Sequence, residues 1–392
     1  MFNPTYDEVV SQISTPAYVF DTDVLCDRIQ FIRNLLGERV HLCYAMKANP
    51  FIIKSIENYI DRYEVCSHGE FEICERAKVS IDKVVLSGVY KAKKDVERVV
   101  SEYRDSIVYT SESVNQFHLI NESATQVGCK VKMLLRVTTG NQFGISEEEL
   151  CSIIKNRADY PFIEIIGIQH FSGTQRKRLK IYQEELAYAD DLITKLEEEY
   201  GYVTQELEFG PGFYVEYFQD AKPYDEVELL KGFSELLENL RFKGHITLEL
   251  GRFIAANCGL YYTDIVDYKV NEIPFCIVNG GMHQMTYFGQ MMAMKIPHYR
   301  QLKQHESHAE PIKCNVSGSL CTINDNLVKA LPLQEPQIGD IIEFKRVGAY
   351  AMCEGISLFL SRDIPSIYLY SKQNGLSLQR GRFETNILNY KQ

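Results

Sequence analysis

Short apolar runs alternate with charged, amphipathic stretches between about residues 22 and 265. Continuous apolar runs are typical of strands buried on both faces, and apolar residues at helical spacing are typical of the helices that cover such strands. The pattern predicts strands at residues 41–45, 63–66, 83–88, 106–110, 130–137, 163–171, 206–210 and 245–250. Segments with helical character follow these strands, so the chain predicts repeated strand–helix units.

Two of the predicted helices begin at a residue suited to capping their first turn. Ser67 precedes GEFE and Ser146 precedes EEEL, and a serine hydroxyl accepts a hydrogen bond from the unpaired backbone N–H groups there. Eight strand–helix units over roughly 250 residues are typical of a (β/α)8 barrel. A doubly wound open sheet would need a GxGxxG motif after an early strand, and the sequence contains none. We therefore predict an α/β fold with a barrel over residues 22–265.

The pattern changes after residue 265. Segments such as PFCIVNGG, IKCNVSGS and SIYLYSK are rich in strand-forming residues, and Gly, Asn and Asp turns separate them with little helical periodicity. We expect a β-domain over residues 266–392, joined by residues 1–21 through their β-prone TPAYVF segment. A chain of 392 residues is long enough for two such domains.

Composition and charge exclude several classes of partner. The net charge of −11 argues against nucleic acid or an anionic membrane as the main partner. No apolar run approaches the roughly 20 residues that span a bilayer. The start of the sequence has neither the basic nor the apolar part of a secretory signal.

The cysteines indicate reduced thiols. The sequence has 11 of them, several in apolar stretches, and contains neither CxxC nor HExxH, so a metal site has no support. Free, buried thiols are typical of a cytoplasmic protein.

Candidate chemistry lies where the predicted strands end, which is where barrel enzymes carry their functional residues. Lys47 follows the first strand in YAMKANP, and a partly desolvated lysine there can attack an aldehyde. A single lysine is more often a surface residue. However, GPGF at 210–213 can hold a phosphate through its backbone N–H groups, and ELGR at 249–252 adds a carboxylate and an arginine. Together these groups meet the requirements of pyridoxal phosphate (PLP).

The ordered set of motifs resembles one known family. YAMKANP, VCSHGE, LLRV, FG at 143–144, GIQHFSGTQ, GPGF, ELGR, GSLCTIND and GAY run nearly end to end. They resemble the fold-type III PLP decarboxylases, the ornithine and diaminopimelate decarboxylase group, which combine an alanine-racemase-type barrel with a β-domain. The resemblance implies PLP as cofactor, an amino-acid-like substrate, and a homodimer with shared active sites.

The same resemblance implies residue roles. Lys47 is the Schiff-base lysine, and Cys321 is the thiol brought across a dimer interface to protonate the substrate's α-carbon. A buried apolar cysteine is the alternative for Cys321. The implied cofactor-binding residues are Glu249 at the pyridine nitrogen, Glu64 and Arg136 beside the ring, and Thr174, Gly210, Gly212, Arg252 and Tyr350 at the phosphate, with Gly251 also among them.

The sixth strand departs from the better-known relatives, which place a histidine where this chain has Phe171. Side chains alternate along a strand, so Gln169 and Phe171 share one face and His170 lies on the other. We therefore expect Phe171 to stack on the cofactor ring, with His170 as the alternative.

The residue after the thiol bears on the substrate. Relatives that handle diamines have an acidic residue at the position of Thr322, and a hydroxyl cannot neutralise a buried ammonium group. Free diamino acids are therefore expected to be poor substrates. Asp325 either reaches such an amine or belongs to a turn. The VNGGMHQM segment, which contains His283, resembles relatives with tethered or bulky substrates, such as the carrier-linked glutamate decarboxylase of butirosin biosynthesis and the exosortase-associated set. A β-turn followed by a core methionine explains it equally well.

Two other functions share this plan. A PLP-dependent racemase would use a tyrosine as its second acid–base group, and GSLCTIND favours a decarboxylase instead. A non-catalytic homologue should have lost Lys47, Arg252 or Cys321, and the sequence keeps all three. We predict a PLP-dependent decarboxylase of an amino acid or an amino-acid conjugate.

Overall fold

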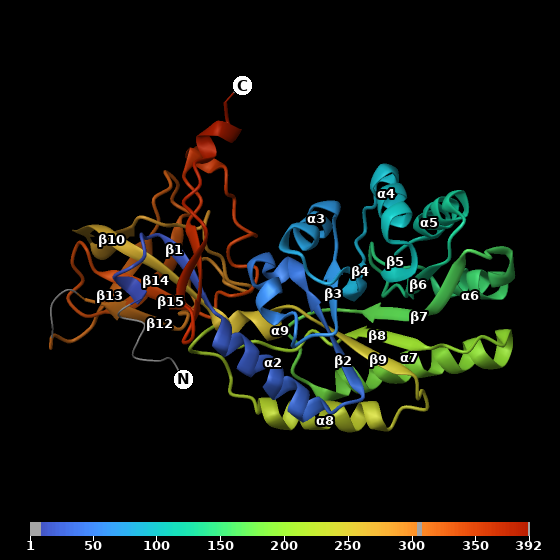
Figure 1. Cartoon of the computed structure of the whole chain (residues 1–392). Helices are drawn as coiled ribbons and strands as arrows, with labels where there is room; N and C mark the ends of the chain where they lie inside the picture. The colour runs from blue at the N-terminus through green and yellow to red at the C-terminus, as the bar shows by residue number, and fades with distance from the viewer. Residues whose placement is uncertain (1–8, 304–307, 391–392) are drawn as a thin grey trace. The chain divides into compact units, whose positions relative to one another are not determined.

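The eight predicted strands form one closed parallel barrel in the computed structural model, which describes residues 9–303 and 308–390 (Figure 1). The last strand pairs with the first, so the sheet has no free edge. The predicted (β/α)8 barrel is confirmed. Its strands are β2 (Val40–Ala45), β3 (Arg62–Val65), β4 (Val84–Leu86), β5 (Val108–Ser111), β6 (Val131–Arg136), β7 (Ile163–Phe171), β8 (Glu206–Gly210) and β9 (His245–Leu250).

Helices alternate with these strands, and both predicted N-caps are confirmed. The Ser67 hydroxyl accepts from the Glu70 amide at 3.2 Å, and Ser146 forms a reciprocal capping box with Glu149. Only short 3₁₀ turns follow β2, because Asn49 and Pro50 cap and start a new turn there. The helices are α2 (Thr22–Leu36), α3 (His68–Ala77), α4 (Lys93–Tyr103), α5 (Val114–Val127), α6 (Glu147–Lys155), α7 (Leu179–Tyr200), α8 (Glu226–Glu238) and α9 (Arg252–Ala255).

The barrel strands carry an apolar cluster and a charged one. One buried cluster packs side chains of β2 and β4 to β7 against one another: Cys43, Val85, Val108, Leu134 and Ile166. On β3, β8 and β9, by contrast, Arg62 pairs with the buried Glu206, which also accepts a hydrogen bond from Thr247 at 2.7 Å. Buried charges are costly unless paired in this way.

The remaining chain forms a second compact unit. Contacts divide the chain into residues 26–214 with 224–254, which hold the barrel, and residues 1–25, 215–223 and 255–392. The expected boundary at residue 265 falls inside a long strand of the second unit. The strands of that unit are β1 (Ala17–Asp21), β10 (Gly259–Asn271), β11 (Ile273–Val278), β12 (Tyr299–Leu302), β13 (Ile312–Ser317), β14 (Asn326–Leu333), β15 (Ile341–Lys345), β16 (Ser366–Ser371) and β17 (Gly375–Arg380).

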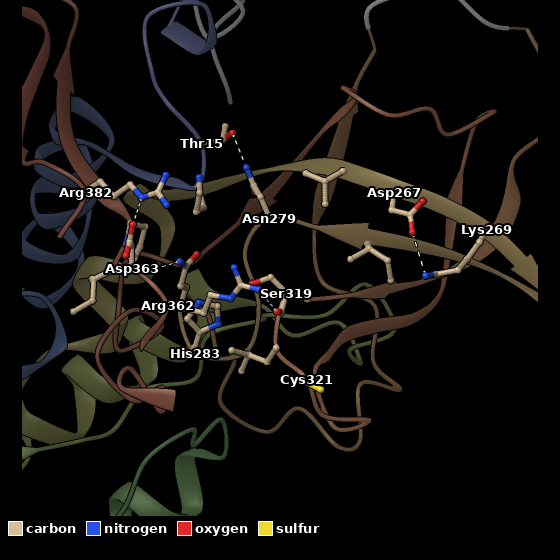
Figure 2. A pocket seen from close by; sticks show the side chains of 18 residues that line it. Thr15, Asp267, Lys269, Asn279, His283, Ser319, Cys321, Arg362, Asp363 and Arg382 are labelled. Carbon is tan, nitrogen blue, oxygen red and sulfur yellow. Dashed lines mark hydrogen bonds and ion pairs between the residues drawn. The ribbon is translucent and has the colours of Figure 1, made fainter. Parts of the chain in front are cut away.

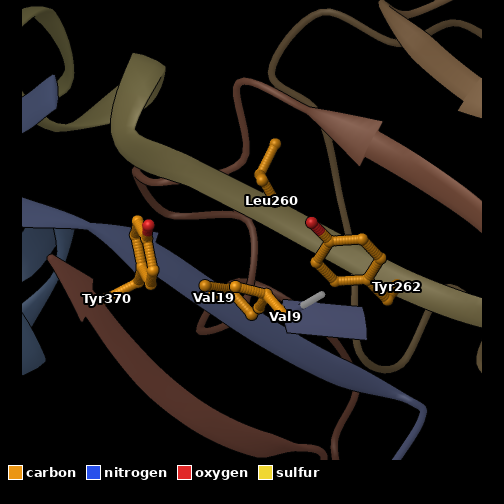
Figure 3. Packing of buried hydrophobic residues seen from close by; sticks show 5 residues of the cluster. All are labelled: Val9, Val19, Leu260, Tyr262 and Tyr370. Carbon is orange, nitrogen blue, oxygen red and sulfur yellow. The ribbon is translucent and has the colours of Figure 1, made fainter. Parts of the chain in front are cut away.

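Strand β1 ties the start of the chain into this second unit. It pairs antiparallel with β10 and parallel with β16. A buried cluster then joins the three strands through Val9, Val19, Leu260, Tyr262 and Tyr370 (Figure 3). Burying an apolar side chain of this size contributes about 1.5–3 kcal/mol, so the cluster anchors the N-terminal segment. Within the described ranges of the chain, no helix is long and apolar enough to cross a membrane.

Candidate active site

Lys47 lies just beyond the carboxyl end of β2, beside an acid from the next strand. Its Nζ is 2.7 Å from Glu64 Oε2, 3.0 Å from Glu64 Oε1 and 3.3 Å from Cys66 Sγ. Burial pushes the pKa of Glu64 upward, but Lys47 outweighs it and holds the pKa below its usual value. Glu64 is therefore ionised at neutral pH and holds the lysine at the strand end.

Glu249 comes from β9 and is held by another strand of the barrel. Gln169 of β7 donates to Glu249 Oε2 at 3.0 Å. The carboxyl of Glu208, on β8, interacts electrostatically with that of Glu249. Gln169 thus faces the barrel interior, as the alternation along β7 predicts.

Glu208 lies in an environment that favours the protonated, neutral form of its carboxyl. Glu208 is fully buried, and no N–H or hydroxyl group in the described ranges donates to either of its oxygens. Burial raises the pKa of Glu208 well above its usual range, and the charge of Glu249 adds to the rise. Burial also raises the pKa of Glu249, and the charge of Glu64 adds to it. Both carboxyl groups therefore bind a proton more readily than an exposed glutamate does.

The glycine turn after β8 is built so that only glycine fits. A Cβ on Gly210 would lie 2.4 Å from Phe171 Cδ2. A Cβ on Gly212 would lie 2.0 Å from the Gly173 carbonyl oxygen and 2.9 Å from Thr174 Cα, and its φ is +58°. The segment after β7 therefore packs directly on the turn, held by an Arg176 N–H to Gly212 O bond of 2.9 Å. Thr174 and Gly212 are neighbours, as the predicted phosphate site requires.

The two aromatic candidates on β7 are separated by the sheet. Phe171 packs against Gly210 at the strand end. The His170 ring instead stacks on Phe209 at 5.7 Å and lies 5.9 Å from the Tyr188 ring of α7. Burial lowers the pKa of His170, so it is neutral in this layer. The geometry favours Phe171 as the ring-stacking group.

Two arginines complete this end of the barrel. Arg136 ends β6, where its Nη1 donates to Glu112 at 2.7 Å and its guanidinium carbon lies 4.7 Å from the Phe143 ring centre. This places the FG motif beside the predicted ring pocket. Arg252 begins α9 directly after Gly251, and its side chain is largely buried.

Cys321 and Thr322 lie in the second unit, in the turn between β13 and β14. The Cys321 side chain is exposed, so the alternative of a buried structural thiol does not apply. Tyr350 also lies in this unit, and its φ of +64° is a strained conformation for a tyrosine. Strain of this kind at a predicted phosphate ligand is consistent with a functional position.

Asp325 is committed to the backbone of this turn. It is buried, and its two carboxylate oxygens accept from the Met282 and Leu320 amides, each at 2.7 Å. A Cβ on Gly281 would lie 2.7 Å from the same carboxylate. The turn explanation left open by the sequence therefore accounts for Asp325 and for the first part of VNGGMHQM.

Sequence reasoning missed several polar neighbours of the predicted residues. Glu208 interacts electrostatically with Glu249. Glu112 accepts a hydrogen bond from Arg136, and Cys66 lies beside Lys47. The alternation of ELEFG, which places two glutamates on one face of a strand, was a usable signal for Glu208. Lys91 was also missed. Its Nζ bonds Gly88 O and Gln116 Oε1, and burial lowers its pKa to about 8.

The barrel end thus offers a lysine held by Glu64, an acid held by a glutamine, and a glycine turn suited to phosphate. These residues fit PLP. A family model for the pyridoxal-dependent decarboxylase pyridoxal binding domain matches residues 23–256. The chain therefore belongs to the PLP-dependent decarboxylases and is a carboxy-lyase with PLP as its cofactor.

Individual relatives match over nearly the whole chain. An L-glutamyl-[BtrI acyl-carrier protein] decarboxylase of Niallia circulans is 26% identical, with 94% of this chain and 91% of the relative covered. A 2-[(L-alanin-3-ylcarbamoyl)methyl]-2-hydroxybutanedioate decarboxylase of Staphylococcus aureus is 24% identical, with 90% and 93% covered. Diaminopimelate decarboxylases also match. The crystal structure of the Helicobacter pylori one, complexed with L-lysine, shares the fold at a TM-score of 0.85 and 22% identity, with 98% of each chain covered.

Proposed function

We propose that this enzyme decarboxylates an amino acid whose distal end is acidic, acylated or tethered, and that free diamino acids are poor substrates. The supporting observation is the surroundings of Cys321. The next residue is Thr322, and the Asp325 carboxylate is occupied by backbone amides. Thr322 carries no charge, and the Asp325 carboxylate is buried and already accepts two backbone hydrogen bonds. Neither is a free, exposed partner for a distal ammonium group, and an unpaired buried charge costs several kcal/mol.

The relatives support the same substrate class. The names of the Niallia circulans and Staphylococcus aureus enzymes describe an amino acid linked to a carrier protein and an amino acid linked to a polycarboxylate. Both substrates end in something other than a free amine. The Helicobacter pylori structure is only 22% identical to this chain, so it supports the fold and not the substrate.

In the proposed reaction each residue has a limited task. Lys47 holds the cofactor and later releases the product amine, while Glu249 holds a proton at the ring nitrogen. Gln169 fixes the Glu249 carboxyl. When bound, PLP supplies an electron-withdrawing ring that stabilises the charge left at the α-carbon as CO2 departs. We propose that Cys321 of the partner subunit then protonates that carbon.

The lysine assignment is tested by reduction. Borohydride treatment of the yellow holoenzyme, followed by peptide mass spectrometry, should place the pyridoxyl group on Lys47. Lys91 is the informative competitor, because burial lowers its pKa to about 8. Lys47→Ala should abolish labelling and Lys91→Gln should preserve it. A pyridoxyl group on Lys91 would overturn the assignment.

The substrate class is tested by CO2 release from matched amino acids. Glutamate, glutamine and carrier-linked glutamate should be compared with ornithine, lysine and meso-diaminopimelate. We expect the best acidic or conjugated substrate to exceed every free diamino acid at least tenfold in kcat/KM, which corresponds to about 1.4 kcal/mol. Efficient turnover of free ornithine or lysine would contradict the proposal.

A further inference from the structure

A cavity of about 560 Å³ lies beside Cys321 within the second unit (Figure 2). Its walls come from β10, β11, the turn that carries Cys321, and the segment before β16. Cys321, Ser319, His283 and Arg362 lie on one side of it. A group bound here would therefore lie next to the thiol.

Among the residues that the structure describes, the cavity carries one positive charge that no carboxylate balances. Its two other cations are paired, since Lys269 contacts Asp267 at 3.1 Å and Arg382 contacts Asp363. Arg362 donates only to the Ser319 carbonyl, at 3.0 Å, and has no carboxylate partner among residues 9–303 and 308–390. A carbonyl leaves the guanidinium charge uncompensated, with most of its five donors available for a planar oxyanion.

His283 adds a second polar group without a partner. It is 3% exposed, and neither ring nitrogen has a hydrogen-bond partner in the described part of the chain. Burial, together with the charge of Arg362, lowers its pKa to about 4, so the ring is neutral at physiological pH. A buried polar group without a partner is uncommon and indicates that a ligand or water completes the site.

We propose that this cavity binds an oxyanion, a carboxylate or a phosphate, on the distal part of the substrate, with Arg362 as its charge partner and His283 as a neutral donor. The inference rests on the proposed function. It specifies that the distal end of the substrate carries an oxyanion where a diamino acid carries an ammonium group. A distal carboxylate of a small amino acid and the phosphate of a carrier arm both have this chemistry.

Alkylation of Cys321 measures the charge without depending on turnover. Iodoacetate and iodoacetamide have nearly the same shape but differ by one negative charge, and peptide mass spectrometry of the holoenzyme gives both rates at Cys321. We expect Arg362→Gln to lower the iodoacetate-to-iodoacetamide rate ratio about threefold or more, as expected for one nearby unit charge in a solvated site. Arg362→Lys should retain most of the ratio.

Lys313→Gln is the matched control, because Lys313 is an exposed cation on β13 that does not line the cavity. It should leave the ratio unchanged. Equal ratios in the parent enzyme and Arg362→Gln would overturn the proposal. The decarboxylase assignment would remain, because alkylation requires neither Lys47 nor a substrate.

Protection experiments identify the source of the oxyanion. Glutarate or 4′-phosphopantetheine should slow iodoacetamide labelling of Cys321 in the parent enzyme but not in Arg362→Gln, whereas neutral glutaramide should protect neither. Protection by glutarate indicates a distal carboxylate, and protection by phosphopantetheine alone indicates a carrier arm. Failure of both anions to protect would contradict the assignment.

Discussion

Among single residues, Glu208 has the most unusual environment in the barrel. It is an acid with no exposed surface, burial and the charge of Glu249 raise its pKa, and Arg62 is 3.7 Å from its Oε2. An arginine at that distance attracts the carboxyl without donating a hydrogen bond to it. The proton on Glu208 is therefore part of the folded state, and folding binds it.

This proton gives the apoenzyme a stability that depends on pH. An unfolded glutamate has a pKa of about 4.3, and burial raises the folded pKa of Glu208 well above that. The contribution is fully present below the unfolded pKa and is lost as pH rises toward the folded value, by up to about 1.4 kcal/mol per pH unit. Glu208→Gln keeps nearly the same shape but cannot ionise. Denaturation of apoenzyme from pH 4.5 to 8 should therefore show the Gln variant gaining on the parent as pH rises. Parallel stability curves would show that Glu208 carries no such proton.

At the scale of single residues, the sequence predicted those side-chain orientations that depend only on the local geometry of a strand. The facing of Gln169 and His170 followed from strand alternation, and the structure confirms it. The proximity of Glu208 to Glu249 and the isolation of Arg362 were not predictable, because each depends on which distant segments meet.

Among the elements, the role of the GPGF turn can be tested by comparing its Gly212 with Gly201, which caps the end of α7. Gly212 and Gly201 have nearly the same left-handed φ, +58° and +59°. A Cβ on Gly201 meets no atom within 4 Å, whereas one on Gly212 would lie 2.0 Å from the Gly173 carbonyl. Alanine at Gly201 therefore measures the backbone cost alone. Alanine at Gly212 adds to this the displacement of the segment that carries Thr174.

We expect Gly201→Ala to lower the free energy of unfolding by about 1 kcal/mol and to leave PLP affinity unchanged. Gly212→Ala should cost more stability and weaken PLP binding at least tenfold, because the turn can no longer approach the segment after β7. Urea denaturation and PLP titration of the apoenzyme measure the two quantities. Equal PLP affinity in both variants would show that this turn does not hold the phosphate.

The barrel strands were predictable because buried parallel strands are short apolar runs with sharp ends. Three of them, β7, β8 and β9, match the predicted bounds at both ends. The helical stretch expected after β2 was wrong, since Asn49 and Pro50 produce 3₁₀ turns instead. In the second unit the sequence indicated strands but not their order, because β1 finds partners at both β10 and β16.

For the whole molecule, the proposed sharing of active sites predicts complementation. Lys47→Ala and Cys321→Ala homodimers should each be nearly inactive. Random subunit exchange makes half of the molecules heterodimers, each with one intact site of two, so activity should recover to about a quarter of the parent value in a two-fold dimer. Distinct affinity tags confirm the exchange. Absence of recovery after confirmed exchange would indicate that each subunit supplies its own thiol.

The pairing of β1 also affects how the protein is made. Thr22, directly after β1, donates its hydroxyl to the Tyr370 carbonyl, 348 residues later. At synthesis rates of about 5–20 residues per second, the ribosome needs on the order of 17–70 s to make that stretch. The barrel segments and β10 emerge during this interval, so one edge of β1 can already pair. The other edge has no partner until β16 is made. Until then the nascent protein carries an unpaired strand edge, which is open to pairing with other chains.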